Sequence, residues 1–337
     1  MTPATAKAAA AARDANVWSG IDAEIRFNDP IGEATWFAAG GCADVLAAPR
    51  SIAALCELSR RCAEASVPLR VLGQGANLLV LEEGVDGVVI DLSAPAFSSA
   101  TWDAANSASA ADHSSETVHI GAGADLFRLV QDSKRLGRRG LAQMAGIPAT
   151  MGGAIRMNAG GKYGDIAQSL ERIEVVLHGG EVRSIEAADL HLGYRHCELP
   201  EGCIVVGAHL RLPHDDPKKI EAEVHEIFEY KKRTQPMGAK SAGCMFRNPT
   251  DPATGQRESA GKLIDQAGLK GLRVGSAFVS ECHGNFLATE RGGRALDVFE
   301  LSRQVQQRVL AHSGWRLERE GVVWSRQRVP SFPEECE

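Results

Sequence analysis

Two glycine-rich segments are the parts of this 337-residue sequence best suited to binding a ligand. The first reads VLGQGANLLV and places Gly73, Gly75 and Asn77 between two runs rich in β-formers. The second reads AGIPATMGGAIRMNAGG, and it is almost uncharged, with small residues between its glycines. Glycine permits positive φ and lets successive N–H groups converge on an anion, so either backbone could lie against a large ligand. For each segment alone, a tight turn is an equally good interpretation.

Two common nucleotide-binding motifs are absent from these segments. Neither follows the pattern G-x-G-x-x-G at the start of a helix, so a Rossmann dinucleotide fold is not indicated. Neither follows G-x-x-x-x-G-K-[ST], so a P-loop nucleotidase is not indicated either.

Composition excludes several classes of protein. The chain is 44% hydrophobic and 24% charged, which is typical of a globular protein, and its length predicts two or three compact units. The net charge of −6 argues against a nucleic-acid partner held by phosphate contacts, although one local basic pocket remains compatible with it. No stretch of about 18 apolar residues occurs, so we expect no membrane span and no membrane partner.

The eight cysteines are expected to be free thiols. They form no C-x-x-C pair and have no zinc-finger spacing to histidines, so we expect no metal site. The first residues, MTPATAKAAAAARDANVWSG, lack the apolar core of a secretory signal. We therefore expect a cytoplasmic protein.

The elements that must position the glycine-rich segments can be read from periodicity. Residues 35–50 predict a strand, a Gly40-Gly41 turn and a second strand, and residues 51–65 predict a helix capped by Ser51. Residues 67–93 predict three strands separated by the first glycine-rich loop and a turn. Residues 96–116 are rich in Ser, Ala and Asp and predict an exposed insertion.

The rest of the chain alternates strands and helices without strict βαβ order. A helix that buries Leu126, Leu129, Val130 and Leu136 and ends at Gly137 is expected, followed by a hairpin that turns at Gly179-Gly180. A domain boundary is expected near Pro213. Further helices are expected over 218–233 and 294–313, the second with a buried face that includes Leu296, Val298, Phe299, Leu301, Val305, Val309 and Leu310. These patterns favour an α+β architecture.

The order of several motifs resembles the UDP-N-acetylenolpyruvoylglucosamine reductase family. These flavoenzymes make UDP-N-acetylmuramate for peptidoglycan. The resemblance covers about 35–323, and it rests on VLGQGANLLV at 71–80, GIPATMGGAIRMNAG at 146–160, YRHCEL at 194–199, KSAGCMFRNP at 240–249, SAGKLIDQAGLKGLRVG at 259–275 and GWRLERE at 314–320. The absence of a tyrosine-loop insertion resembles the shorter subtype of the family.

The resemblance implies an FAD-binding fold of the p-cresol methylhydroxylase kind in two subdomains, followed by an α+β substrate-binding domain. The expected division is an N-terminal tail at 1–30, an FAD-binding region at 31–213, a substrate-binding domain at 214–325 and a C-terminal tail at 326–337. The two FAD subdomains are expected at about 31–95 and 117–213, with the insertion between them.

The implied reaction is NADPH-dependent reduction of the enolpyruvyl group of a sugar nucleotide, with FAD as bound cofactor and a monomeric enzyme. One alternative is another FAD-linked oxidoreductase on the same scaffold, acting on an alcohol or a lactone. A sugar-nucleotide-binding protein without activity is a further alternative, which the chemically filled catalytic positions disfavour.

Resemblance also assigns the cofactor contacts. Position 76 is alanine where serine is usual in the family, and Ala38 and Ala39 stand where a basic side chain usually precedes the Gly40-Gly41 turn. The residues expected to contact FAD are Gly73, Gly75, Ala76, Asn77, Leu78, Gly146, Ile147, Pro148, Thr150, Gly152, Gly153 and Asn158.

Three residues match the family's catalytic groups. Arg195 would stabilise the enolate-like intermediate, because a guanidinium stays charged and can fork onto a carboxylate. Glu320 would polarise the same intermediate, with Glu318 as the alternative acid. Cys244 stands where the family usually has a serine proton donor, and a thiol with a pKa near 8.5 can donate a proton more readily than a hydroxyl.

Each of these side chains has an ordinary structural interpretation. A randomly chosen arginine or glutamate is a surface residue, and a free cysteine is most often packed as a small hydrophobe. For the substrate, the resemblance favours Tyr194, Arg233, Asn248 and Lys270.

Overall fold

The computed structural model describes residues 8, 10–102, 116–327 and 329, which form two compact units. The first unit consists of the described residues within Met1–Phe27, Asp44–Gln74 and Gly87–Tyr230. The second consists of those within Asn28–Ala43, Gly75–Asp86 and Lys231–Glu337.

A four-stranded sheet opens the first unit. Its order is β1-β2-β5-β3, and β3 pairs parallel to β5. The strands are β1 (Ala23–Asp29), β2 (Ala43–Pro49), β3 (Leu69–Leu72) and β5 (Val85–Asp91). The short helix η1 (Ala15–Trp18) precedes this sheet, and helix α2 (Ile52–Glu64) follows β2. As predicted, Ser51 caps α2, where its hydroxyl accepts a hydrogen bond from the Ala54 amide at 3.2 Å.

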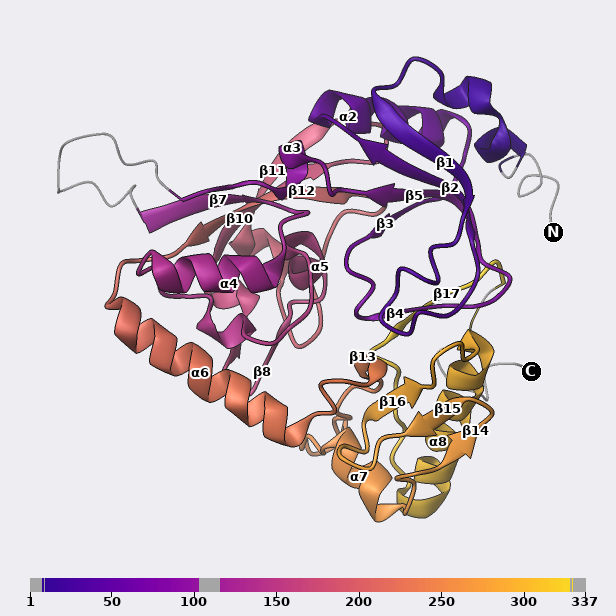
Figure 1. The fold of residues 1–337 in the computed structure, drawn as a ribbon, viewed down its shortest axis with the longest axis vertical. Coiled ribbons are helices and arrows are strands. Elements are labelled where there is room, and N and C mark those ends of the chain that lie inside the picture. The colour runs from indigo at the N-terminus through magenta and orange to yellow at the C-terminus, as the bar shows by residue number, and fades with distance from the viewer. Residues whose placement is uncertain (1–7, 9, 103–115, 328, 330–337) are drawn as a thin grey trace. The chain divides into compact units, whose positions relative to one another are not determined.

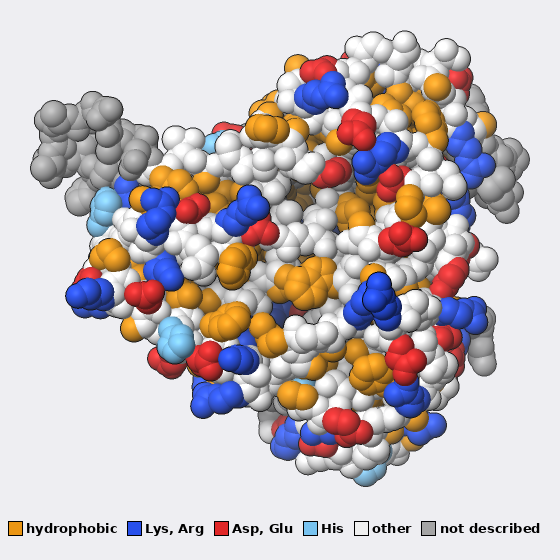
Figure 2. All heavy atoms as spheres, viewed as in Figure 1, with side chains coloured by type: hydrophobic (Ala, Val, Ile, Leu, Met, Phe, Trp, Pro, Cys, Tyr) orange, Lys and Arg blue, Asp and Glu red, His pale blue; other side chains and the backbone are white. Residues whose placement is uncertain are grey.

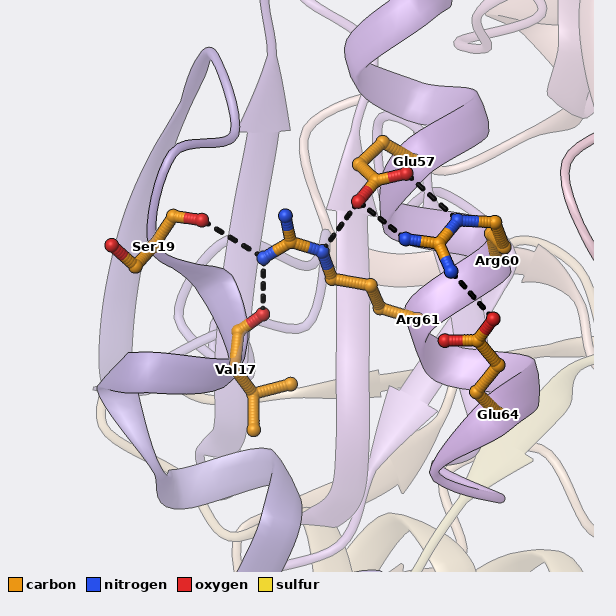
Figure 3. A network of polar contacts seen from close by, with 6 residues as sticks. All are labelled: Val17, Ser19, Glu57, Arg60, Arg61 and Glu64. Atoms are coloured by element: carbon orange, nitrogen blue, oxygen red, sulfur yellow. Dashed lines mark hydrogen bonds and ion pairs between the residues drawn. The ribbon is translucent and has the colours of Figure 1, made fainter.

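The outer face of α2 carries a network of two arginines and two glutamates (Figure 3). Arg60 bridges Glu57 and Glu64, with N–O distances of 2.7 and 2.5 Å. Arg61 also binds Glu57, at 2.6 Å, and reaches the backbone carbonyls of residues 17 and 19. These hydrogen bonds from Arg60 and Arg61 lower the pKa of Glu57 from 4.5 to about 2.

A second sheet of the first unit has the order β11-β10-β12-β7-β6 and is antiparallel. Helices α4 and α5 lie along one face of it (Figure 1), where α5 packs on β7 and β12. The strands are β6 (Ala100–Thr101), β7 (Thr117–Gly121), β10 (Leu170–Val176), β11 (Val182–Glu186) and β12 (Ile204–Arg211). The remaining elements are α3 (Pro95–Ser98), α4 (Leu126–Arg135), η3 (Ala142–Met144), α5 (Met151–Arg156), β8 (Gly160–Gly161), β9 (Gly164–Asp165), η4 (Ile166–Gln168), η5 (Ala187–Leu190) and α6 (Pro217–Thr234).

The second unit has its own core around an antiparallel sheet of order β13-β16-β15-β14. Helix α8 packs against β14, β15 and β16, and a parallel pair, β4 with β17, completes the unit. Its elements are β4 (Leu78–Val80), β13 (Lys240–Cys244), α7 (Ala260–Gln266), β14 (Arg273–Val274), β15 (Ala277–Val279), β16 (Phe286–Thr289), α8 (Ala295–Ser313) and β17 (Val322–Trp324).

Most of the expected elements are present, but one predicted strand and one predicted buried residue are not confirmed. The helices predicted over 51–65, 218–233 and 294–313 and the hairpin at Gly179-Gly180 are confirmed. The strand predicted at Thr35 is instead a series of turns, because its amide bonds back to the Gly32 carbonyl. Leu296, predicted to be buried on α8, is 44% exposed.

Gly40 lies against β4 rather than at the tip of a hairpin. A Cβ there would stand 1.8 Å from the carbonyl oxygen of Val80, at a φ of +112°, so only glycine fits. Leu136 forms the C-cap of α4 and is half-buried, and Gly137 follows it with a φ of +64°. Most of the predicted insertion, residues 103–115, lies outside the described residues.

The division by contacts differs from the linear division expected from the sequence. The first unit continues to Tyr230 and includes most of α6, whereas the expected boundary is near Pro213. Residues 28–43 and 75–86 belong to the second unit, because β4 pairs with β17 and the Gly40 region packs on β4.

Two surface properties bear on the possible partners. Among the described residues, no helix is long and apolar enough to cross a membrane. On the face drawn in Figure 2, acidic and basic side chains are interspersed rather than gathered by sign.

Candidate flavin site and catalytic residues

The second glycine-rich segment forms the start of α5 in the first unit. Thr150 caps this helix by accepting a hydrogen bond from the Gly153 amide at 3.3 Å. Gly152 packs closely on Ala122, since its amide donates to the Ala122 carbonyl at 2.7 Å and a Cβ would lie 2.9 Å from the Ala122 Cβ. Gly146 turns the chain at a φ of +71°, as the composition predicted for this loop.

The first glycine-rich segment meets this region through Gly73. A Cβ on Gly73 would lie 2.8 Å from the Thr150 hydroxyl oxygen. A Cβ on Gly153 would meet only that same hydroxyl, at 3.3 Å, and otherwise open space. The backbone at Gly73, Thr150 and Gly153 therefore offers a surface almost without side chains, which suits the close approach of a large cofactor such as FAD.

The remainder of the first segment belongs to the second unit. Gly75 has a φ of +64°, and a Cβ there would lie 2.7 Å from the Thr35 Cα. Leu78 is buried and pairs with Val322 in the β4–β17 ladder. Packing thus accounts for Gly75 and Leu78, and their expected contact with FAD stays a prediction, as do those of Ala76, Ile147 and Pro148.

Asn158 positions the loop that bears Tyr194 and Arg195. It is 2% exposed, and its amide nitrogen donates to the Gly193 carbonyl at 2.8 Å. Its carbonyl oxygen accepts from the Ala167 amide at 3.3 Å. The side chain is engaged within the protein, so its expected contact with FAD also stays a prediction.

Arg195 occupies a tight turn in a conformation that arginine rarely adopts. Gly193 and His196 exchange backbone hydrogen bonds of 3.0 and 3.1 Å, which leaves Tyr194 and Arg195 at the tip. The φ of Arg195 is +54°, in the left-handed region that glycine or asparagine normally fills. Its guanidinium donates to the Gly160 carbonyl at 2.8 Å, which anchors the side chain to the end of the second glycine-rich segment.

The second unit brings the segments of Cys244 and Glu320 together. Cys244 is the last residue of β13 and is half-buried, directly after Gly243, whose φ is +74°. The carbonyl of Met245 accepts hydrogen bonds from the amides of Glu320 at 2.8 Å and Gly321 at 3.3 Å. The predicted proton donor and the predicted acid therefore lie on adjoining backbones.

The two candidate acids differ in surroundings. Glu318 is exposed, whereas Glu320 is half-buried. The carbonyl of Glu320 accepts a hydrogen bond from the Asn77 side chain at 3.3 Å, and the amide of Val322 donates to the Asn77 carbonyl at 3.0 Å. Asn77 thus fixes the backbone of Glu320, and the Arg247 amide holds the carbonyl of Glu318 in the same way, at 2.9 Å. The two acids therefore differ in exposure, and the choice of Glu320 stays a prediction.

Sequence reasoning did not single out Asn285, which holds the chain just after Cys244. Asn285 is 2% exposed, and its side chain accepts from the Phe246 amide at 2.9 Å and donates to the Phe246 carbonyl at 2.8 Å. Its own carbonyl accepts from the Met245 amide at 2.8 Å. Only the fold reveals this role, since Asn285 is remote in sequence from the segment that it braces.

Arg247 was also missed. Its Nε is shielded from solvent and, among the described residues, is the buried side-chain nitrogen without a hydrogen-bond partner. A buried guanidinium N–H without a partner is costly, and an anionic ligand would satisfy it. The sequence signal for this residue was a cation three positions after Cys244.

The remaining substrate candidates are dispersed. Asn248 accepts a hydrogen bond from the Ala260 amide at 3.0 Å, at the start of α7, and Lys270 pairs with Asp265 at 3.1 Å. Arg233 is exposed in the last turn of α6, and Tyr194 is exposed beside the Arg195 guanidinium. Their expected contacts with substrate stay predictions.

Several of the other cysteines lose their thiol proton less readily than an ordinary cysteine. Burial raises the pKa of Cys62 to about 12 and that of Cys197 to about 11, and it also raises the pKa values of Cys56 and Cys203. Cys282 is exposed, and Cys336 lies outside the described residues. The buried thiols are therefore harder to ionise than an ordinary cysteine, which suits a packing role.

Comparison with known proteins defines the class first. Residues 43–186 match the family model described as an FAD binding domain, and this region has an α+β architecture. Residues 235–324 match the model of the UDP-N-acetylenolpyruvoylglucosamine reductase C-terminal domain.

Individual relatives agree with these two models. The UDP-N-acetylenolpyruvoylglucosamine reductase of Erythrobacter litoralis is 37% identical over 92% of this chain and 89% of its own length. That of Thermus thermophilus is 41% identical over 74% of this chain and 85% of its own. The crystal structure of the Thermus caldophilus enzyme superimposes with a TM-score of 0.74 at 38% identity, covering 90% of this chain and 99% of that one. The chain belongs to the UDP-N-acetylenolpyruvoylglucosamine reductase family.

Proposed function

We propose that this protein is an FAD-dependent oxidoreductase that uses NADPH to reduce the enolpyruvyl group of UDP-N-acetylenolpyruvoylglucosamine to UDP-N-acetylmuramate, a step of peptidoglycan precursor synthesis. Family membership supports the activity. The structural observation that carries it is the 2.8 Å hydrogen bond from the Glu320 amide to the Met245 carbonyl, which brings the acid and the thiol segment together.

The glycine-rich backbone of the first unit is proposed to hold FAD. Gly73, Gly146, Thr150 and Gly153 contribute the surface, and Gly152 keeps it in place through its contact with Ala122. When bound, FAD supplies a hydride route from NADPH to the terminal carbon of the enolpyruvyl double bond.

Addition of a hydride to that carbon leaves an electron pair on the neighbouring carbon and its carboxylate. Arg195 is proposed to stabilise this charge, because a planar guanidinium can donate two parallel hydrogen bonds to a carboxylate. Glu320 is proposed to polarise the same intermediate. Arg247 is a further candidate cation for an anionic group of the substrate, since its buried Nε lacks a partner among the described residues.

Cys244 is proposed to complete the reduction. Its Sγ–H bond breaks as the proton passes to the carbon that carries the negative charge, and the resulting thiolate takes a proton back from solvent. Asn285 is proposed as a positioning residue, because it fixes Met245 and Phe246 immediately after Cys244. We expect KM to change little and kcat to fall when Asn285 is replaced by alanine.

The broader assignments follow from the same proposal. The first unit would provide most of the flavin site, and the second unit would provide the C-terminal substrate-binding residues Arg233, Asn248 and Lys270. We expect Tyr194 to contact substrate, and we propose a monomeric, cytoplasmic enzyme.

The proposed function is tested with the purified protein under anaerobic conditions. The protein should be yellow, lose its visible absorbance when NADPH is added, and regain it when UDP-N-acetylenolpyruvoylglucosamine follows. A colourless protein that takes up no FAD would contradict the cofactor. A reduced protein that is not reoxidised by the sugar nucleotide would contradict the substrate.

A further inference from the structure

Two histidines and a glutamate converge on the second sheet of the first unit. His119 lies on β7, Glu174 on β10 and His209 on β12, and these strands are adjacent in the order β10-β12-β7. The register sets His209 opposite His119 and Glu174 opposite Gly207. Because side chains alternate along a strand, the three groups emerge from one face of the sheet.

The opposite face is occupied by the core. Val118 and Ile120 flank His119 in β7, and Ala208 and Leu210 flank His209 in β12, and all four are fully buried. The side chains of His119, Glu174 and His209 keep 39%, 34% and 14% of their exposure. The cluster is thus built on a rigid sheet and is open to solvent.

The distances suit a metal ion. The Nε2 atom of His119 lies 3.2 Å from Oε2 of Glu174, and the Nε2 atom of His209 lies 3.2 Å from Oε1 of the same carboxylate. The potential ligand atoms all lie within 4.8 Å of one another. Tetrahedral zinc with bonds of about 2.0–2.1 Å separates neighbouring ligand atoms by roughly 3.3 Å. The two histidine–glutamate distances already match this value, and the two histidine nitrogens, which lie within 4.8 Å of each other, would have to approach.

Gly207 provides the space for this arrangement. A Cβ at Gly207 would lie 2.8 Å from the His119 Nε2 and 2.9 Å from the Glu174 Oε2. Glycine weakens the interior of a strand, and its presence there often marks a place where other groups approach closely. At Gly207, β12 therefore places no side chain next to the atoms that would bind the ion.

We propose that His119, Glu174 and His209 form a site for a divalent transition metal, with Zn²⁺ as the ion that fits best. Two neutral imidazoles and one carboxylate are a common donor set for zinc and leave a coordination position open to water. The bound ion would cross-link β7 to β10 across β12. No metal site was expected from cysteine and histidine spacing, and these three ligands lie far apart along the chain without a shared motif.

Arg172 opposes metal binding and supplies a sensitive test. Its Nη2 lies 3.3 and 3.4 Å from the two ring nitrogens of His209, and the hydrogen bonds there are exposed. Its positive charge repels a cation, so Arg172→Gln should tighten Zn²⁺ binding on the order of tenfold, since the repulsion acts through high-dielectric surroundings.

The experiment is calorimetric titration of Zn²⁺ alone into the chelator-treated, FAD-loaded protein. We expect one saturable Zn²⁺ per chain, lost in Glu174→Gln and in His119→Ala and weakened in Gly207→Ala. The control is Glu198→Gln. Glu198 makes an exposed 2.8 Å pair with His191, and neither residue belongs to the cluster of His119, Glu174 and His209. This control should bind Zn²⁺ as the wild type does.

Cobalt(II) substitution separates this site from the free cysteines. A site of two imidazoles and a carboxylate gives d–d bands without sulfur-to-metal charge transfer, whereas a thiolate site shows that charge transfer. The proposal is overturned if neither the wild type nor Arg172→Gln binds Zn²⁺, or if the cobalt spectrum is that of a thiolate site. It is also overturned if Glu174→Gln still binds Zn²⁺ or if Glu198→Gln does not. Because the readout is metal binding, none of these outcomes depends on the proposed reductase activity.

Discussion

The amide of Glu320 donates a 2.8 Å hydrogen bond to the carbonyl of Met245, the residue that directly follows Cys244. Together with the hydrogen bond from the Arg247 amide to the Glu318 carbonyl, at 2.9 Å, this bond joins two motifs that lie far apart in the sequence. Asn285 braces the same segment from the other side through Met245 and Phe246. The second unit therefore holds the thiol and the acid on a common backbone framework.

The choice of acid can be tested with two matched variants. Glu320→Gln should lower kcat on the order of 10²–10³ and leave KM nearly unchanged, because the charge that it acts on exists mainly beyond the ground state. Glu318→Gln should behave as the wild type, since Glu318 is exposed. Steady-state kinetics with both variants show which glutamate is the catalytic acid, and the reverse pattern would assign that role to Glu318.

Cys244 is expected to be the proton donor. Cys244→Ser should keep appreciable activity, because a serine hydroxyl can also donate a proton, whereas Cys244→Ala should stall reduction of the enolpyruvyl group, because alanine has no such proton. A packed thiol predicts a different order, with alanine tolerated about as well as serine. Single-turnover reduction of substrate by prereduced enzyme distinguishes the two.

Alkylation gives an independent test of the same thiol. The experiment uses a Cys282→Ala background, because Cys282 is exposed and would react as well. Substrate should protect Cys244 from the reagent. Reactivity that is unchanged by substrate, together with a fully active alanine variant, would remove Cys244 from the mechanism.

A substitution at Arg195 can separate an effect on stability from an effect on catalysis. Its φ of +54° is unfavourable for arginine and tolerated by asparagine, so Arg195→Asn should fold at least as stably as the wild type. The same change removes the guanidinium and should lower kcat by about 10²–10³. Urea unfolding and turnover are measured on the same preparations. Wild-type turnover in Arg195→Asn would show that this guanidinium is not catalytic.

Gly153 tests the cofactor surface. A side chain there meets only the Thr150 hydroxyl at 3.3 Å within the protein, so Gly153→Val should fold but bind FAD much more weakly. Gly161→Ala is the control, because a Cβ at Gly161 meets nothing within 4 Å. Flavin content after purification and titration of the apoprotein with FAD provide the readout. Full occupancy in Gly153→Val would contradict the assignment of this loop.

Glu57 is expected to contribute to the loss of fold stability in acid. Its pKa is about 2 in the folded protein, below the ordinary 4.5, because Arg60 and Arg61 donate hydrogen bonds to the carboxylate. A depressed folded-state pKa stabilises the fold above pH 4.5, and this contribution is lost as pH falls toward 2. Glu57→Gln should flatten the pH dependence of the free energy of unfolding over that range.

The control for Glu57 is Glu181→Gln, which removes an exposed ion pair with Arg183. The Glu57 effect should shrink at high salt, because the network is exposed and salt screens it. An identical pH dependence in Glu57→Gln and the wild type would contradict the prediction.

Local patterns predicted local structure well. The helix capped by Ser51 and the hairpin at Gly179-Gly180 depend on residues close in sequence, and both are present. The division into units could not be predicted in this way, because β4 pairs in parallel with β17 across more than half of the chain. The turns at Thr35 follow from contacts with Gly32 and Gly75, which no short-range periodicity encodes.

In the candidate site, too, the sequence predicted what short segments encode and not what distant segments form together. Motifs identified Arg195, Cys244 and Glu320, because each lies in a distinctive short segment. The bracing role of Asn285 depends on segments that are distant in sequence. So does the burial of the Arg247 Nε, which has no hydrogen-bond partner within the part of the chain that the structure describes. The engagement of Asn158 within the protein likewise depends on Gly193, which is remote from it in sequence.

The central claim is tested most directly by identifying the product. Purified FAD-loaded protein is incubated with NADPH and UDP-N-acetylenolpyruvoylglucosamine, and the sugar nucleotides are separated and weighed by mass spectrometry while NADPH loss is followed. We expect one UDP-N-acetylmuramate formed for each NADPH oxidised, and a much slower reaction in Glu320→Gln. NADPH oxidation without this product, or a substrate that is recovered unchanged, would contradict it.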